Sequence, residues 1–197
     1  MWSITRPSAA RIAAAIRDQS PRPVSYAEVG RSDGGDAPPG FDLDHNRLLL
    51  GHGEPAFRAA CDALRAWRMF PAPWTAIEPP GAPIATGTVV AMLAHSLGLW
   101  WLNTCRIVYV VDEESPIRRF GFAYGTLPRH VEKGEERFTV EWLADDSVWY
   151  DIRAFSRPRY WMVRLGYPIA RALQRRFVRD SKAAMQATVA AAVADRT

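Results

Sequence analysis

The fold is decided by the stretch Arg119–Phe138, which reads RFGFAYGTLPRHVEKGEERF. It contains an aromatic run, a loop that includes Pro128 and Gly134, and a second run that begins at Glu135. Small and large residues alternate in the first run, and successive side chains of a β-strand point to opposite faces of the sheet. The stretch therefore predicts a β-hairpin whose first strand has one small face and one aromatic face.

The small face of this strand consists of Gly121, Ala123 and Gly125. Glycine weakens a strand interior, so its presence indicates that something bulky approaches the backbone. Two interpretations are open. A helix or a tryptophan side chain of the same chain packs there, or a ligand binds there and Tyr124 forms an aromatic wall with an available hydroxyl group.

Further strands lie on both sides of the hairpin, with short connections between them. Strands joined by tight turns must be antiparallel. The predicted strands are Thr88–His95, Trp100–Val111, Arg118–Leu127, Glu135–Leu143 and Ser147–Ser156. An antiparallel sheet with one apolar face needs cover, which a long C-terminal helix in the region of Tyr167–Met185 supplies.

The C-terminal helix separates basic and apolar side chains. Its basic face carries Arg171, Arg175, Arg179 and Lys182, and the opposite arc carries Ile169, Leu173, Phe177, Ala184 and Thr188. From Arg157 to Lys182 there are eight basic residues and one acid, so this segment accounts for most of the net charge of +4. The basic face is either a solvated helix surface or a contact for nucleic acid or anionic lipid.

The N-terminal half mixes helices, short strands and one loop. Pro55–Phe70 is the clearest helix because its apolar residues recur at i, i+3 and i+4. The other predicted elements are a helix at Pro7–Gln19, a possible strand at Val24–Val29, a surface loop at Arg31–Gly40 and a short strand at Leu48–Leu50.

Six segments together carry a family resemblance. They are the hairpin and the segments Tyr26–Gly30, Leu50–Phe70, Cys105–Glu113, Val148–Pro158 and Tyr167–Met185. In these the chain resembles the domain-of-unknown-function family number nineteen-ninety, also called uncharacterised protein family UPF zero-five-four-eight. The family has no established catalytic residues, so the resemblance transfers none.

The order of elements resembles the helix-grip architecture of the START and birch-pollen-allergen superfamily. That resemblance implies an α+β fold in which a curved antiparallel β-sheet wraps around a long C-terminal helix, here with an extra N-terminal helix. It also implies a cavity for an apolar or amphipathic small molecule. We expect one domain over residues 1–197, with a helical extension at 1–23 and a helix-grip-like domain at 24–197.

Composition bounds the class of protein. A hydrophobic fraction of 48%, with eight Trp, eight Phe and six Tyr, argues for a packed globule rather than a disordered chain. Cys61 and Cys105 lack the spacing of a metal or redox motif, and the histidines lack ligand spacing, so we expect no metal and no cofactor. The apolar patch near the N-terminus is too short for a signal sequence or a membrane span. We expect a cytoplasmic protein with reduced thiols.

The sequence does not support a nucleotide-binding site or a catalytic serine nucleophile. The segment Leu50–Ala56 superficially matches a dinucleotide fingerprint, but no parallel strand follows its helix, and Glu54 places a negative charge where a pyrophosphate would bind. The chain contains no P-loop and no GxSxG motif, and Ser156 has no nearby histidine in the sequence.

Alternation singles out one carboxyl group as a candidate for chemistry. Glu136 shares a face with Phe138, whereas Glu135 faces the other way, so Glu136 is the inward carboxylate. A buried carboxylate needs a partner or a proton, and we expect Arg106 or Arg153 to pair with it. Catalytic candidates are Glu136, Tyr124 and His130, the last in a loop where a solvated ring is the alternative. Ligand-binding candidates are Phe122, Tyr124, Arg106, Trp142, Tyr150 and Arg153.

Three functions remain open from the sequence. The first is binding of an apolar or amphipathic small molecule between the sheet and the C-terminal helix. The second is a cofactor-independent enzyme of the cyclase, dehydratase or hydrolase type that uses acid and base residues in that cavity. The third is a scaffold, or a protein that binds acidic surfaces through its basic helix. We expect no nucleic acid partner and no membrane span, and the sequence leaves ligand identity and oligomeric state open.

Overall fold

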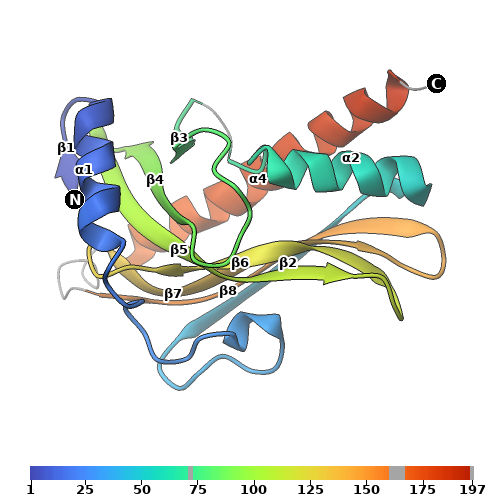
Figure 1. Ribbon diagram of the computed structural model, residues 1–197, viewed down its shortest axis with the longest axis horizontal. Helices are drawn as coiled ribbons and strands as arrows, with labels where there is room; N and C mark the ends of the chain where they lie inside the picture. The colour runs from blue at the N-terminus through green and yellow to red at the C-terminus, as the bar shows by residue number, and fades with distance from the viewer. Residues whose placement is uncertain (71–72, 160–166, 196–197) are drawn as a thin grey trace.

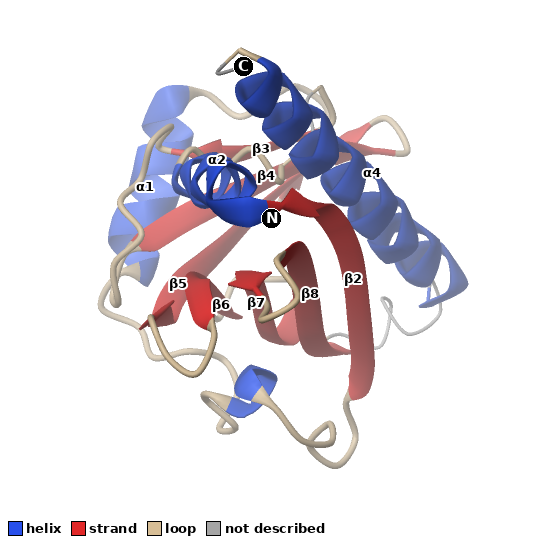
Figure 2. Cartoon of the chain, turned by 90° about the vertical axis from the view of Figure 1, so that its right-hand side faces the viewer, coloured by secondary structure: helices blue, strands red, loops and turns tan. Residues whose placement is uncertain are grey.

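A computed structural model describes residues 1–70, 73–159 and 167–195. Its centre is one eight-stranded antiparallel sheet with the strand order β2-β8-β7-β6-β5-β4-β3, and β1 pairs with β5 off this path. The strands are β1 (Trp2–Ser3), β2 (Asp42–His52), β3 (Thr75–Glu78), β4 (Val89–Ser96), β5 (Leu99–Glu113), β6 (Arg118–Thr126), β7 (Glu132–Trp142) and β8 (Ser147–Pro158). The sheet curves strongly, as Figure 2 shows.

Helices lie on both faces of this sheet. The helices are α1 (Ala9–Gln19), the 3₁₀ turn η1 (Arg31–Asp33), α2 (Gly53–Arg65) and α4 (Tyr167–Ala194). Helix α4 runs along the sheet with α2 beside it, and α1 lies at the end formed by β4 and β5 (Figures 1 and 2). A curved antiparallel sheet gripping a long C-terminal helix confirms the α+β helix-grip expectation.

The segment after α2 departs from the predicted helix Pro55–Phe70. The helix ends at Arg65, and Trp67 takes a left-handed backbone conformation with φ of 56°. That conformation is unfavourable for a bulky residue, and tertiary contacts compensate for it. The Trp67 indole N–H donates to the Ala82 carbonyl at 2.8 Å, and its ring lies 4.8 Å from that of Phe122.

Helix α4 buries a narrower stripe than the helical wheel predicts. Ser181, Met185 and Val189 are buried, and the Phe177 ring packs 5.3 Å from that of Phe70. Ile169, which we predicted in the apolar arc, is 51% exposed. The buried residues of the helix therefore belong to its middle and C-terminal turns, and its N-terminal turns meet the sheet through polar side chains.

The basic residues of α4 are largely paired with acids of the same chain. Arg171 binds Asp44 of β2, and both Arg176 and Arg179 contact Asp180 on their own helix. Arg164, part of the basic segment noted in the sequence, lies outside the described residues. Among the helices that the structure describes, none has the length and apolarity needed to cross a bilayer.

The convex face of the sheet is covered by the segment 24–41. No strand forms at Val24–Val29, so that prediction is wrong; the backbone N–H of Ser25 instead donates to the Thr126 carbonyl at 2.8 Å. A Cβ atom on Gly125 would collide with the ring of Tyr26. At Gly125 the small face of β6 therefore accommodates a side chain of this chain, although it is a tyrosine and not the helix or tryptophan we expected.

Candidate functional site

Tyr124 and Glu136 form the centre of the candidate site. They sit directly opposite one another on β6 and β7, and the Tyr124 phenol donates a hydrogen bond of 2.7 Å to Oε2 of Glu136. Alternation places both side chains on the concave face, below α4. The structure thus brings together two of the three predicted catalytic residues.

The surroundings shift the proton equilibria of both groups. Burial raises the pKa of Glu136 to about 7, although the Tyr124 hydrogen bond acts in the opposite direction, and the nearby Glu132 and Asp44 raise it further. Burial, followed by the charge of Glu136, raises the pKa of Tyr124 well above its ordinary value. Near neutral pH the phenol keeps its proton while the carboxyl group both gains and loses one, which suits acid–base exchange.

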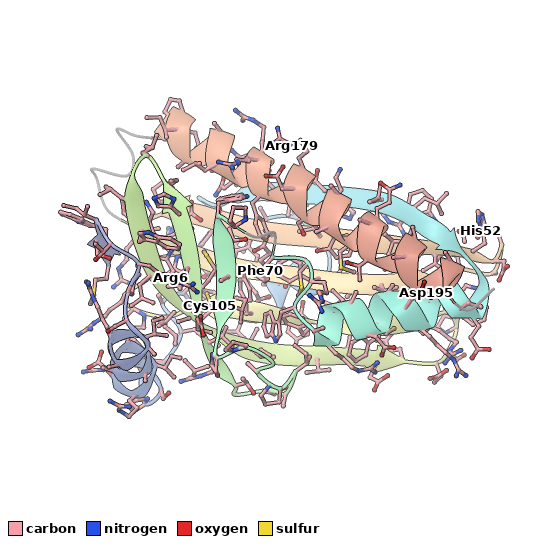
Figure 3. The ribbon with its side chains drawn as sticks, turned by 90° about the horizontal axis from the view of Figure 1, so that it is seen from above. Arg6, His52, Phe70, Cys105, Arg179 and Asp195 are labelled. Atoms are coloured by element: carbon pink, nitrogen blue, oxygen red, sulfur yellow. The ribbon has the colours of Figure 1, made fainter. Side chains whose placement is uncertain are left out.

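Aromatic rings surround the pair on its apolar side. The Tyr124 ring lies 5.5 Å from that of Phe138 and 6.3 Å from that of Phe70. Phe70, near the centre of the molecule in Figure 3, in turn contacts Phe177 of α4. Tyr124 is buried, whereas Glu136 is only partly buried. The carboxyl group is therefore accessible beside an apolar aromatic cluster.

A series of linked polar side chains, which the sequence did not predict, lies along the concave face. Glu132 accepts a hydrogen bond from the Gln174 side-chain amide at 2.8 Å, and Gln174 accepts one from Arg171 at 2.8 Å. Arg171 also donates to both carboxylate oxygens of Asp44, at 2.5 and 2.7 Å. Burial raises the pKa of Glu132. The only local signal was that Glu132 has the same strand parity as Glu136.

Three predicted ligand-binding residues lie on the helix side but pack against separate neighbours. Phe122 is fully buried between Trp67 and Phe138. Tyr150 is fully buried, and its hydroxyl lies 3.0 Å from that of Ser181.

Trp142 is the third of these residues and lies beside α2. Its ring is 5.9 Å from that of Phe57, and its indole N–H donates to Asp146 at 2.9 Å. Phe122, Tyr150 and Trp142 therefore have different immediate neighbours within one hydrophobic cluster, which also contains Tyr124.

The prediction that Arg106 or Arg153 pairs with Glu136 is wrong. Arg106 donates to the Ser20 carbonyl at 2.5 Å, and Arg153 donates to the backbone carbonyl of Gly35. In the strand register these residues sit opposite Gly125 and Arg137, which have the parity of the convex face. Both arginines therefore hold the N-terminal segments rather than the candidate site.

His130 is buried instead of solvated. Its Nδ1 accepts the backbone N–H of Glu132 at 3.0 Å, so the ring is engaged within its own loop. Burial lowers the pKa of His130 to about 3. The imidazole is therefore neutral at physiological pH, and its hydrogen bond serves the geometry of the β6–β7 loop.

Glu135 is also buried, on the convex face. Its carboxylate accepts hydrogen bonds from the Tyr26 phenol (2.6 Å), the Gly30 N–H (2.9 Å), and the N–H and hydroxyl of Ser32 (3.0 and 2.5 Å). Four donors satisfy the carboxylate and fix the covering segment to β7. We interpret Glu135 as a structural anchor.

Two clefts are lined by described residues. One, of about 410 Å³, lies between α2 and the β5–β6 hairpin, and is floored by Phe57, Cys61 and Phe120. The other, of about 330 Å³, is lined by Gly40, Asp42, Lys133, Arg157, Pro158 and Arg159. Neither cleft includes Tyr124 or Glu136 in its lining.

Comparison with known proteins establishes the family. Residues 25–184 match the family model described as "Domain of unknown function (DUF1990)". The chain belongs to the DUF1990 family. This confirms the resemblance read from the sequence segments.

Relatives of this DUF1990 chain occur in distant organisms. It is 36% identical over 191 residues to a UPF0548 protein of Deinococcus radiodurans, covering 91% of this chain and 94% of that protein. It is 41% identical over 150 residues to a UPF0548 protein of Dictyostelium discoideum, covering 72% of this chain and 69% of that protein. These names state no activity.

Solved structures are similar to this DUF1990 chain. The hypothetical protein jhp0584 from Helicobacter pylori matches with a TM-score of 0.52 and 13% identity, over 78% of this chain and 90% of that chain. Ara h 8.0201 matches with a TM-score of 0.47 and 14% identity, over 77% of this chain and 99% of that chain. At such identities the likeness concerns the fold alone, so function must be argued from the site.

Proposed function

We propose that this DUF1990 chain binds an apolar or amphipathic small molecule beside Tyr124 and Glu136, between the sheet and α4. The observation that carries the proposal is the hydrogen-bonded pair itself. A partly buried carboxyl group next to an aromatic cluster offers one polar anchor and a wide apolar contact, which is the usual composition of a small-molecule site.

The apolar part of the ligand takes the place of aromatic contacts over the pair. Phe70 lies in the non-helical segment after α2, and Phe177 is a partly buried residue of α4. Their rings touch one another and the ring of Phe138. A ligand ring that enters there replaces ring–ring contacts with similar ones, so a modest shift of Phe70 and Phe177 suffices.

The polar part of the ligand binds at the carboxyl group. When protonated, Glu136 donates to a carbonyl or ether oxygen; when ionised, it accepts from a hydroxyl or an amine. With a pKa of about 7, Glu136 offers both forms near neutral pH. The site therefore favours small molecules that carry an oxygen or nitrogen function at one end of an apolar body.

The same pKa supports a second candidate, a cofactor-independent enzyme. A general acid or base works best when its pKa lies near the operating pH, and Glu136 meets that condition. In such a reaction Glu136 transfers the proton and Tyr124 orients it. Cyclisation, dehydration and hydrolysis are the reaction types that need only such proton transfer.

We also propose that residues 1–197 act as one domain, in a cytoplasmic setting that suits its two free, buried cysteines. Helix α1 supports the first point, because Ile12 and Ala15 pack against Ala91, Leu93 and Leu102 of the sheet. The helical extension at 1–23 is then part of the same scaffold as the helix-grip-like domain at 24–197.

The test is to identify copurifying molecules by native mass spectrometry and to titrate them back into the protein. We expect one molecule per chain and a loss of affinity of about tenfold in Glu136→Gln, the scale of one hydrogen bond to a charged group. The variant Tyr167→Phe, which removes an exposed phenol bonded to Asp42, serves as the matched control. Equal affinity for the wild type and Glu136→Gln would reject this site, and turnover that falls roughly a hundredfold in Glu136→Gln would select the enzyme.

A further inference from the structure

A cleft of about 410 Å³ lies between α2 and the β5–β6 hairpin, separate from Tyr124 and Glu136. Its size is within the range of pockets that hold small organic molecules. The floor is apolar and buried, because Phe57, Cys61 and Phe120 are only 6%, 4% and 7% exposed. The cleft therefore combines a concave shape with an apolar base.

Charges of both signs line each wall of this cleft. Helix α2 contributes Arg58, Asp62 and Arg65. The hairpin contributes the acids Asp112, Glu113 and Glu114 and the bases Arg118 and Arg119. Four arginines thus face four carboxylates, and the cleft has no excess of either charge.

Charged residues from both walls of the cleft act on the Cys61 thiol at its floor. Burial raises the pKa of the Cys61 thiol to about 12. Arg65 and Arg118 oppose this shift, whereas Asp62 and Asp112 add to it. One cation and one anion from each wall therefore lie close enough to the floor to act on the same sulfur atom.

The arginines stack on the floor rings. The guanidinium carbon of Arg65 lies 4.1 Å from the ring centroid of Phe120, and that of Arg118 lies 5.0 Å from that of Phe57. Such stacking holds the guanidinium groups beside the apolar base, with several N–H donors each. A carboxylate that enters the cleft meets these donors next to an aromatic surface.

The existing ion pairs do not block the cleft. Arg65 pairs with Asp62 at 3.2 Å, Arg118 with Glu114 at 2.7 Å and Arg119 with Glu113 at 2.6 Å, and the acid in each pair is more than 40% exposed. Exposed pairs of this kind stabilise a protein little, so a ligand group exchanges with them at low cost. Asp112 is exposed, and its side chain has no hydrogen-bond or ion-pair partner among the described residues.

We infer that this cleft binds a small zwitterion with an apolar or aromatic side group, the chemistry of a free amino acid. Its carboxylate binds Arg65 and Arg118, its ammonium group binds Asp112, and its side group lies on Phe57 and Phe120. Each charge of the ligand meets an opposite charge on the protein.

Singly charged and neutral ligands fit this cleft less well. A simple anion pairs with the guanidinium groups but is repelled by the carboxylates beside them, and the reverse holds for a simple cation. A neutral apolar molecule would desolvate the charged walls and give them no partner in return. Only a ligand with both charges compensates both kinds of wall residue.

Isothermal titration calorimetry on the full chain tests this inference with matched probes. L-Phenylalanine and L-leucine are the zwitterions; 3-phenylpropionate lacks the ammonium group, and 2-phenylethylamine lacks the carboxylate. We expect at least one zwitterion to bind with one-to-one stoichiometry, roughly tenfold more tightly than either singly charged analogue. Absence of binding by both zwitterions, or equal affinity for the analogues, would overturn the inference.

Variants locate the site. Asp112→Asn should weaken zwitterion binding roughly fivefold to tenfold and should not weaken the binding of 3-phenylpropionate. Asp195→Asn, at the exposed end of α4, is the matched control and should bind as the wild type does. Asp112→Asn with unchanged affinity would contradict the assignment. Glu136→Gln should leave this binding intact, so failure here and failure of the proposed ligand site are distinguishable.

Discussion

Tyr26 and Glu135 are separated by 109 residues in the chain and joined by a hydrogen bond of 2.6 Å on the convex face of the sheet. The Tyr26 ring rests on Gly125, the register partner of Glu135. One tyrosine thus occupies the space left by a glycine and donates to the carboxylate next to it. The segment at 26–30 and the central hairpin therefore depend on each other: the hairpin provides the space at Gly125 for the Tyr26 ring, and Tyr26 provides a hydrogen-bond donor for Glu135.

Removal of the Tyr26 hydroxyl should destabilise the protein. In Tyr26→Phe the buried carboxylate of Glu135 loses one of the four donors described above, and hydrogen bonds to charged groups contribute about 1.5–3 kcal/mol. Chemical denaturation should show a loss of that size. Tyr167→Phe also removes a phenol bonded to a carboxylate, but at an exposed position, and should cost less than about 1 kcal/mol. Similar losses in the two variants would contradict the anchoring role.

Local alternation was sufficient to place Tyr124 and Glu136. Both residues lie within one hairpin, and strand parity over a few residues decides which face each side chain takes. The same reasoning missed the burial of Glu135, because its partners belong to a loop about a hundred residues earlier. No local pattern indicates that a loop rich in glycine, aspartate and proline covers the second face of a sheet.

Strand alternation also gave a wrong prediction when it was used to pair residues on different strands. Arg106 and Arg153 were expected to meet Glu136, but alternation within a strand says nothing about register between strands. A register shift between Ile107 and Tyr109 on β5 adds to this uncertainty. The end of α2 was missed for a related reason: the left-handed conformation of Trp67 is fixed by its contacts with Ala82 and Phe122, which the sequence pattern does not contain.

Helix α4 should contribute to stability through its buried stripe and not through its N-terminal turns. Met185 is fully buried, so Met185→Ala should cost about 2–5 kcal/mol. Ile169 is 51% exposed, and Ile169→Ala should change the free energy of unfolding by less than about 0.5 kcal/mol. Thermal or chemical unfolding of the two variants checks both values. A larger loss for Ile169→Ala than for Met185→Ala would mean that the helix presents a different face to the sheet.

His130 should contribute to acid sensitivity. Its pKa is about 3 in the folded protein, against an ordinary value of 6.5. As the pH falls from 6.5 towards 3, the unfolded chain takes up a proton that the folded chain does not, so stability is lost in this window. His130→Asn keeps an acceptor for the Glu132 N–H and cannot titrate. The difference in unfolding free energy between variant and wild type should therefore change steadily between pH 6.5 and 3, and a constant difference would show that His130 does not titrate as described.

Glu136 should make the free energy of unfolding change with pH in the opposite direction, and in a higher pH range. Its pKa is about 7 when folded, against an ordinary value of 4.5. As the pH rises from 4.5 to 7, the unfolded chain releases the proton while the folded chain keeps it, so stability falls across this window and levels off above it. Glu136→Gln cannot ionise, and its stability relative to the wild type should rise from pH 4.5 to 7 and then remain constant.

The hydrogen bond from Tyr124 provides a second test of the Glu136 titration. This bond favours the ionised carboxylate and holds the pKa of Glu136 lower than burial alone would set it. Tyr124→Phe removes the donor but keeps the ring, so the pKa of Glu136 should rise above that of the wild type, and the loss of stability should extend to higher pH. Carboxyl ¹³C chemical shifts of Glu136 followed against pH measure both values directly. A Glu136 that titrates near 4.5 in the wild type, or at the same pH with and without the phenol, would remove the acid–base pair as the basis of the proposed site.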